Sequence, residues 1–194
     1  MVTNSINDRM MNEMLDLLVY FMAYALAGFT LKLGDDLLDD LNSPDLAWYP
    51  LAASGLLFGL LMTSSEWDLV LLTAIIVGVV LSGKVNRREF SIGFLIIVVV
   101  ILLRGVPTIS GWLDWLSLLI MLFLAAVLDE RGNDWADSSA SPNAAKFFEF
   151  RLTLKISALL LVIPWPMFFL TAIGIWLFDL GYELAGRLSR SMLS

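Results

Sequence analysis

Seven long apolar segments restrict what this chain can fold into more than any other feature. They cover about residues 14–31, 46–64, 67–83, 90–103, 112–128, 150–163 and 165–185. Of the 194 residues, 59% are apolar and only 16% are charged, whereas a soluble domain has about 25% charged residues. A helix needs about 20 residues to cross a bilayer. We therefore expect an all-α integral membrane protein with about seven transmembrane helices, forming a single transmembrane domain over residues 1–194.

The composition excludes several classes of function. The chain has no cysteine and no histidine, which removes disulfide scaffolds, Ser-His-Asp and Cys-His catalysis, and the usual zinc sites. The net charge of −7 argues against a nucleic-acid partner. Chemistry must therefore come from carboxylates, Lys and Arg, hydroxyls and the backbone, and sites rich in carboxylates favour hard cations such as Mg²⁺.

The basic residues predict an orientation in the cell membrane. With seven spans, alternate loops lie on opposite sides, and one side receives only Arg9 and Arg104. The other side receives Lys32, Lys84, Arg87, Arg88, Arg131, Lys146, Arg151, Lys155, Arg187 and Arg190. Because cytoplasmic loops are enriched in Lys and Arg, we expect the N-terminus outside and the C-terminus in the cytoplasm.

An internal repeat divides the chain into two halves. The pattern G-x-D-x-x-D-x-x-x-S-P begins at Gly34 and again at Gly132, and at this offset of 98 residues, 19 of 69 aligned positions are identical. We predict two parallel three-helix repeats, 15–83 and 113–181, joined by a linker helix within 84–111. Because four spans separate equivalent positions, both acidic motifs should lie on the same, cytoplasmic, face.

The acidic motifs are candidates for metal binding. If each motif continues its helix, Asp36 and Asp39 share a face, as do Asp134 and Asp137. Two carboxylates 4 Å apart repel by about 4 kcal/mol at an effective dielectric of about 20, so such a cluster would protonate, splay apart or bind a divalent cation. Candidate diphosphate-binding residues on the same side are Lys84, Arg87, Arg88, Lys146 and Arg151. The apolar bundle could hold a lipid tail.

These motifs resemble those of the UbiA superfamily of intramembrane prenyltransferases, which carry N-D-x-x-D-x-x-x-D and D-x-x-x-D. Residues 35–43 look like the first motif and 129–137 like the second, while residues 84–88 fall where that family has a basic loop. Asp35 stands in place of Asn, Ser43 in place of the last Asp, and the family usually has nine spans rather than seven, so the chain resembles a short, divergent member. The resemblance implies Mg²⁺ ligands at Asp35, Asp36, Asp39, Asp129, Asp134 and Asp137.

The resemblance also implies an activity. Asp36, Asp39, Asp134 and Asp137 would be the catalytic residues of a Mg²⁺-dependent prenyltransferase, which moves a prenyl group from a prenyl diphosphate to a lipid or aromatic acceptor. The alternatives are a divalent-cation or small-solute transporter, or a catalytically inactive member of the same fold. A CDP-alcohol phosphotransferase would need D-G-x-x-A-R after the first Asp pair, whereas Leu37 follows Asp36 here.

Overall fold

The computed structural model describes residues 2–41, 43–83, 85, 87–139 and 151–193. All regular secondary structure in this part of the chain is helical, and it contains no strand, as the sequence predicted. It forms seven α-helices and one short 3₁₀ helix: α1 (Val2–Asp39), α2 (Pro44–Met62), α3 (Glu66–Leu81), α4 (Phe90–Arg104), α5 (Trp112–Ser139), α7 (Leu152–Leu161), η1 (Pro166–Phe168) and α8 (Phe169–Leu193).

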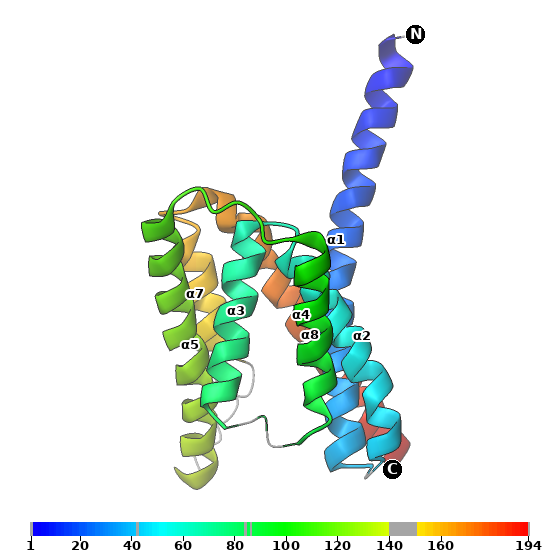
Figure 1. Ribbon diagram of the computed structural model, residues 1–194, viewed down its shortest axis with the longest axis vertical. Coiled ribbons are helices and arrows are strands. Elements are labelled where there is room, and N and C mark those ends of the chain that lie inside the picture. The colour runs from blue at the N-terminus through cyan, green and yellow to red at the C-terminus, as the bar shows by residue number, and fades with distance from the viewer. Residues whose placement is uncertain (1, 42, 84, 86, 140–150, 194) are drawn as a thin grey trace.

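Successive helices run in opposite directions along one bundle (Figure 1). The helices α1, α3, α5 and α8 all end on the same side of the bundle. We call this side the acidic end, because the last turns of α1 carry Asp35, Asp36 and Asp39 there. Both acidic motifs continue their helices, since α1 extends to Asp39 and α5 to Ser139. The motifs therefore lie at the same end of the bundle, and the N-terminus lies at the other (Figure 1).

Four helical stretches are long and apolar enough to cross a membrane. They are Arg9–Asp39, Pro44–Met62, Trp112–Gly132 and Pro166–Ser191. The apolar helices α4 and α7 are shorter, at 15 and 10 residues, or roughly 22 and 15 Å at 1.5 Å per residue. Large apolar side chains such as Leu102, Leu113 and Ile163 point away from the bundle. This surface suits a lipid environment.

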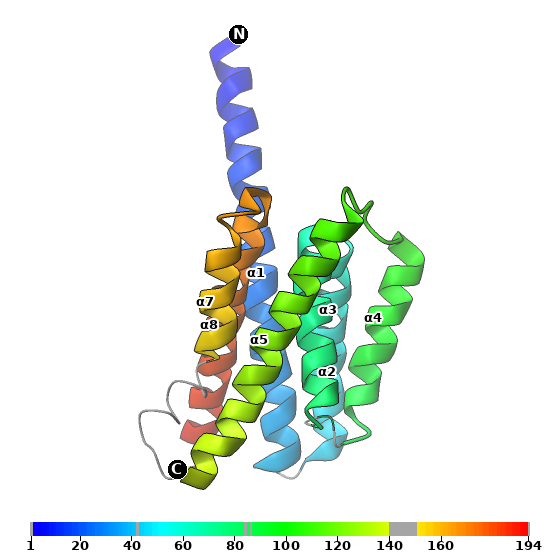
Figure 2. The same cartoon turned by 90° about the vertical axis from the view of Figure 1, so that its left-hand side faces the viewer.

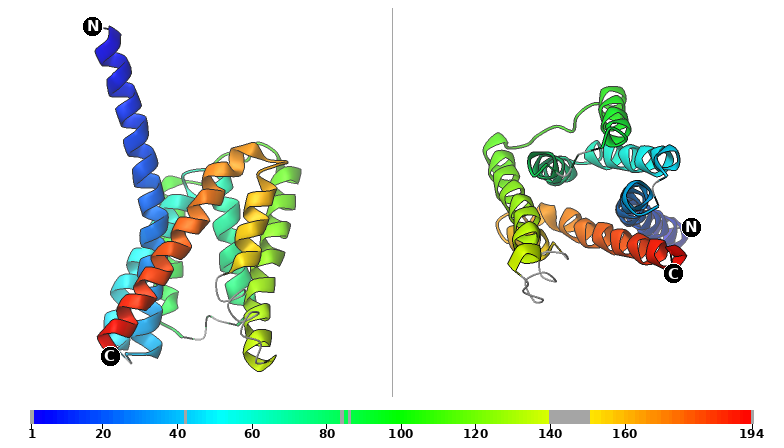
Figure 3. Two further views of the ribbon diagram at one scale, coloured as in Figure 1. Left: turned by 180° about the vertical axis from the view of Figure 1, so that it is seen from behind. Right: turned by 90° about the horizontal axis from the view of Figure 1, so that it is seen from below.

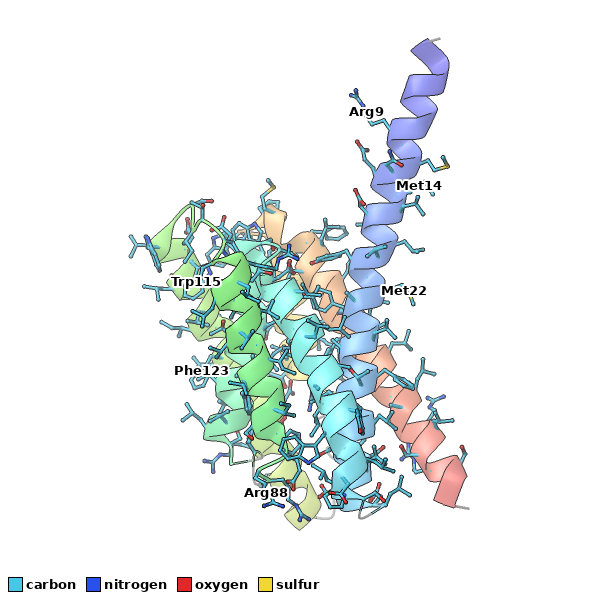
Figure 4. The ribbon with its side chains drawn as sticks, turned by 45° about the vertical axis from the view of Figure 1, so that its right-hand side comes forward. Arg9, Met14, Met22, Arg88, Trp115 and Phe123 are labelled. Carbon is cyan, nitrogen blue, oxygen red and sulfur yellow. The ribbon has the colours of Figure 1, made fainter. Side chains whose placement is uncertain are left out.

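The first half of α1 projects beyond the rest of the bundle (Figures 2 and 3). Every side chain from Arg9 to Val19 is exposed, and Figure 4 shows Arg9 and Met14 on this projecting part. The packed part of α1 begins near Tyr20, which is partly buried, and Tyr24, which is fully buried.

Glycines allow the closest helix contact in the bundle, between α1 and α8. A Cβ atom added at Gly28 would lie 1.9 Å from the carbonyl oxygen of Phe178, and one at Gly181 would lie 1.9 Å from that of Ala25. Small residues let membrane helices approach in this way. The close approach aligns the acidic end of α1 with the segment of α8 that carries Asp179 and Tyr182.

The remaining helices pack in neighbouring pairs (Figures 2 and 3). α1 contacts α2 as well as α8, α4 packs on α2, α3 packs on α5, and α5 packs on α7. The centre of the bundle is filled by side chains from several helices, including the fully buried Leu71, Leu72, Leu118 and Leu122. The result is a bundle whose packed core lies beneath an open acidic end.

Candidate functional site

A cavity of about 600 Å³ opens among the helices at the acidic end. Its volume lies within the range of small-molecule sites. Its deeper walls are apolar and come from α2, α3, α4 and α8, with the side chains of Leu51, Phe58, Ile75, Val79, Phe94, Ile97 and Phe178. The cavity therefore joins a charged region to a chamber suited to a hydrocarbon chain.

The charged part of the lining is strongly acidic. It contains eight carboxylates: Asp35, Asp36, Asp39, Asp40, Asp129, Glu130, Asp179 and Glu183. Of the described basic side chains, three line it: Lys32, Arg151 and Arg190. The formal excess of five negative charges favours a cation, and an anionic ligand needs accompanying cations to enter.

Asp36 is the most buried carboxylate that α1 contributes to the cavity. Its side chain is only 3% exposed, and its Oδ1 lies 2.7 Å from the Lys32 ammonium one helical turn earlier. Lys32 Nζ also lies 3.4 Å from Asp35 Oδ2. The second oxygen of Asp36, Oδ2, is buried and has no hydrogen-bond partner among the described residues. A buried carboxylate oxygen without a partner is costly, so this oxygen is available to a ligand.

Tyr182 lies between the acidic end of α1 and the start of α7. The Lys32 ammonium lies 5.3 Å from its ring centroid, and the Arg151 guanidinium lies 5.0 Å from it. Both distances fall within the range of cation–π contacts. Tyr182 therefore holds two cations near each other on the cavity wall.

Asp129 of α5 fixes the start of α7. Its Oδ1 accepts a hydrogen bond from the backbone N–H of Thr153 at 3.0 Å, and its Oδ2 accepts one from that of Leu154 at 2.7 Å. Arg151, just before α7, adopts a left-handed φ of 48°, which is uncommon for a residue other than glycine. Arg151 also pairs with Glu130 at 3.6 Å. Asp129 thus acts as a helix cap that positions Arg151, while Arg151 lines the cavity.

The other predicted site residues lie in different surroundings. Arg87 reaches Asp39 at 3.5 Å across an exposed contact. Arg88 bonds to the neighbouring Glu89 and is exposed at the acidic end (Figure 4). Lys84 and Lys146 lie outside the described residues. Asp134 and Asp137 belong to the last turns of α5, but their side chains lie outside the description. Among the described residues, no three acidic side chains converge closely enough to hold a metal ion by themselves.

The cavity residues that were not predicted as site residues include Lys32, Glu130, Asp179 and Tyr182. The spacing of Lys32 four residues before Asp36 is a sequence signal for an ion pair. Asp179 forms an ion pair with the buried Lys155 of α7. That contact joins residues 24 positions apart, so no local pattern reveals it.

A second polar cluster lies toward the other end of the bundle, around Asp68 in the first turn of α3. Asp68 Oδ1 accepts hydrogen bonds from the hydroxyls of Tyr20, Tyr24 and Thr171 at 2.6–2.8 Å, and Oδ2 accepts one from Ser65 at 2.6 Å. Within the described part of the chain, no basic side chain pairs with Asp68. Four hydroxyl donors satisfy this buried carboxylate and tie α1, α3 and α8 together.

Comparison of the chain with models of protein families, with curated proteins and with solved structures gave no match. The cavity and the sequence motifs therefore carry the functional inference.

Proposed function

We propose that the chain is a Mg²⁺-dependent intramembrane prenyltransferase, which transfers a prenyl group from a prenyl diphosphate to a lipid or aromatic acceptor. One observation carries the proposal: one cavity joins carboxylates from α1 and α5 to an apolar chamber, and its lining includes Asp36, whose buried Oδ2 has no hydrogen-bond partner within the described residues. A diphosphate fits the charged end when cations accompany it, and its hydrocarbon tail fits the chamber.

The donor set of the cavity suits Mg²⁺. Carboxylate oxygens are the ligands that Mg²⁺ prefers, and Mg²⁺ sites usually combine one or two carboxylates with substrate phosphates and waters. Asp36 supplies a free oxygen, and Asp35 and Asp39 lie near it on α1. We propose that these three side chains and Asp134 and Asp137 from the end of α5 share the binding of Mg²⁺, with one or two of them contacting each ion and the substrate phosphates and waters completing its shell. Each carboxylate oxygen of Asp129 already accepts a hydrogen bond from a backbone amide, so we assign Asp129 a positioning role.

The basic residues have distinct parts in the proposal. Arg151 and Lys32 line the cavity beside Tyr182, so they would bind the phosphate oxygens. Arg87 borders the entrance through Asp39, and Lys84 and Lys146 remain candidates for the same purpose. Bound Mg²⁺ would neutralise the diphosphate and favour its departure as an anion. The apolar walls would keep water from the allylic carbon.

We also propose that the two halves form parallel repeats across the cell membrane. At the offset of 98 residues, α1 corresponds to α5, α2 to α7 and α3 to α8. The contacts of α1 with α2 and α8 then correspond to those of α5 with α7 and α3, which are observed. Arg9 and Arg104 lie at the end away from the acidic motifs, which supports an outer N-terminus and a cytoplasmic acidic end.

A second candidate function is transport of a divalent cation or a small solute. The excess of negative charge in the cavity favours it, because a cation would be attracted without a phosphate partner. The buried Asp68 cluster adds an ionisable group within the bundle, where transporters often have them.

The test of the proposed function is release of pyrophosphate from geranylgeranyl diphosphate by the full chain in lipid vesicles, with a mixture of lipid and aromatic acceptors. We expect release that requires Mg²⁺ and is lost in Asp36→Asn. The matched control is Asp114→Asn, which makes the same change in the first turn of α5, away from the cavity, and should retain activity. Cation flux into the vesicles without pyrophosphate release would instead favour the transporter.

A further inference from the structure

Lys32 occupies the position in the cavity where a metal ion would meet Asp36. Its ammonium lies 2.7 Å from Asp36 Oδ1 and 3.4 Å from Asp35 Oδ2. One ammonium thus contacts two adjacent carboxylates and compensates one of their two negative charges. Asp36 nevertheless keeps one buried oxygen without a partner among the described residues, so the ion pair satisfies only half of this carboxylate.

The surroundings of Lys32 offer its ammonium a second binding position. It lines the cavity, is about one quarter exposed, and lies against the Tyr182 ring beside Arg151. The lysine stem is long and flexible, and its ammonium donates in any direction. An anion placed between Lys32 and Arg151 could therefore accept hydrogen bonds from both cations.

We propose that Lys32 is an internal counter-ion that holds the acidic site at rest and moves to the ligand phosphate when a divalent cation takes its place on Asp36. The inference rests on the proposed function and adds to it a coupling between binding of the metal ion and binding of the diphosphate. A metal ion that binds Asp36 through both carboxylate oxygens must displace Lys32 from Oδ1, and without a phosphate it gives Lys32 no new partner. A metal ion with a diphosphate displaces Lys32 and supplies one. Each ligand should therefore strengthen binding of the other to the same extent, as thermodynamic linkage requires.

The proposal predicts opposite effects of one substitution on the two ligands. In Lys32→Met, the carboxylates lose their resident cation, so Mn²⁺ alone should bind at least about tenfold more tightly than in the wild type. The same variant lacks a phosphate donor, so inorganic pyrophosphate added to saturating Mg²⁺ should no longer raise the midpoint of thermal unfolding. Lys32→Arg keeps the positive charge and should keep weak binding of Mn²⁺ alone.

The experiment measures free Mn²⁺ by electron paramagnetic resonance in titrations of the detergent-purified full chain. Arg104→Met is the matched control, because it removes one positive charge from an exposed side chain at the end of α4, away from Asp36. Its Mn²⁺ affinity should stay within about twofold of the wild type. The double variant Lys32→Met/Asp36→Asn should lose the tighter binding.

The outcomes separate this inference from the proposed function. If Mn²⁺ binding depends on Asp36 but Lys32→Met binds no more tightly than Arg104→Met, the counter-ion role is wrong and the metal site stands. If no variant binds Mn²⁺ through Asp36, the counter-ion role and the proposed metal site both fail. If Lys32→Met tightens Mn²⁺ binding but keeps the full pyrophosphate shift, the transfer of Lys32 to the phosphate is wrong.

Discussion

Replacing either glycine of the α1–α8 contact by alanine should destabilise the bundle. The added Cβ atom of Gly28→Ala would lie 1.9 Å from the carbonyl oxygen of Phe178, and a real Cβ atom almost never approaches within 3.0 Å. The two backbones must therefore separate by about 1 Å. Overpacking of this kind costs about 1–3 kcal/mol, and the reciprocal Gly181→Ala, 1.9 Å from the oxygen of Ala25, should cost about the same.

The assay is thermal unfolding of the detergent-purified protein, followed by tryptophan fluorescence. At about 2–4 °C per kcal/mol for a chain of this length, each variant should lower the Tm by several degrees. Gly186→Ala is the control on α8, because its Cβ atom would meet the Lys32 side chain at 3.4 Å from Cε and 3.8 Å from Cγ, which are ordinary contacts. It should leave the Tm unchanged or raise it, since alanine favours a helix over glycine by about 1 kcal/mol. Equal Tm values for Gly28→Ala and wild type, or an equal loss in Gly186→Ala, would refute the close approach of α1 and α8.

Two further stability predictions concern the polar contacts within the bundle. Tyr24→Phe removes one hydroxyl donor from the buried Asp68, so it should lower the free energy of unfolding by about 1.5–3 kcal/mol, the usual value for a hydrogen bond to a charged group. The control Tyr49→Phe, at an exposed position, should leave the Tm unchanged. Equal Tm values for the two variants would contradict the Asp68 cluster. Asp129→Ala removes the acceptors for the first amides of α7, so it should lower the free energy of unfolding by about 0.5–2 kcal/mol, as loss of a helix cap does. Hydrogen exchange should become faster only at the start of α7. Unchanged exchange there would argue against the cap.

The sequence predicted the helices well because apolar segments follow directly from the need to bury or shield hydrocarbon. The predicted ends were less accurate, and α1 shows why. The first apolar segment was placed at 14–31, whereas the helix covers Val2–Asp39. Hydropathy marks only the apolar part, but helix-compatible polar residues continue the hydrogen-bonding pattern until Pro44 begins the next helix.

The site was predicted in part. Repetition of the acidic motif indicated that Asp36 and the end of α5 lie at one end of the bundle, and Arg151 was placed among the cavity residues. The contribution of α8 could not be predicted, because Asp179 and Tyr182 reach the cavity only through the close contact of α8 with α1. That contact depends on two glycines that are far apart in the sequence, Gly28 and Gly181. The buried Asp68 cluster was missed for the same reason, since its donors come from α1, from α8 and from the residue that caps α3.

The measurement that tests the central claim most directly is the thermal stability of the detergent-purified chain with Mg²⁺ and geranylgeranyl diphosphate, each alone and together. A ligand that binds only the folded state must raise the Tm. We expect a large shift only when both are present, abolished in Asp36→Asn and retained in Asp114→Asn. A shift of the same size with Mg²⁺ alone, or one that survives Asp36→Asn, would contradict a prenyl diphosphate site built on this carboxylate.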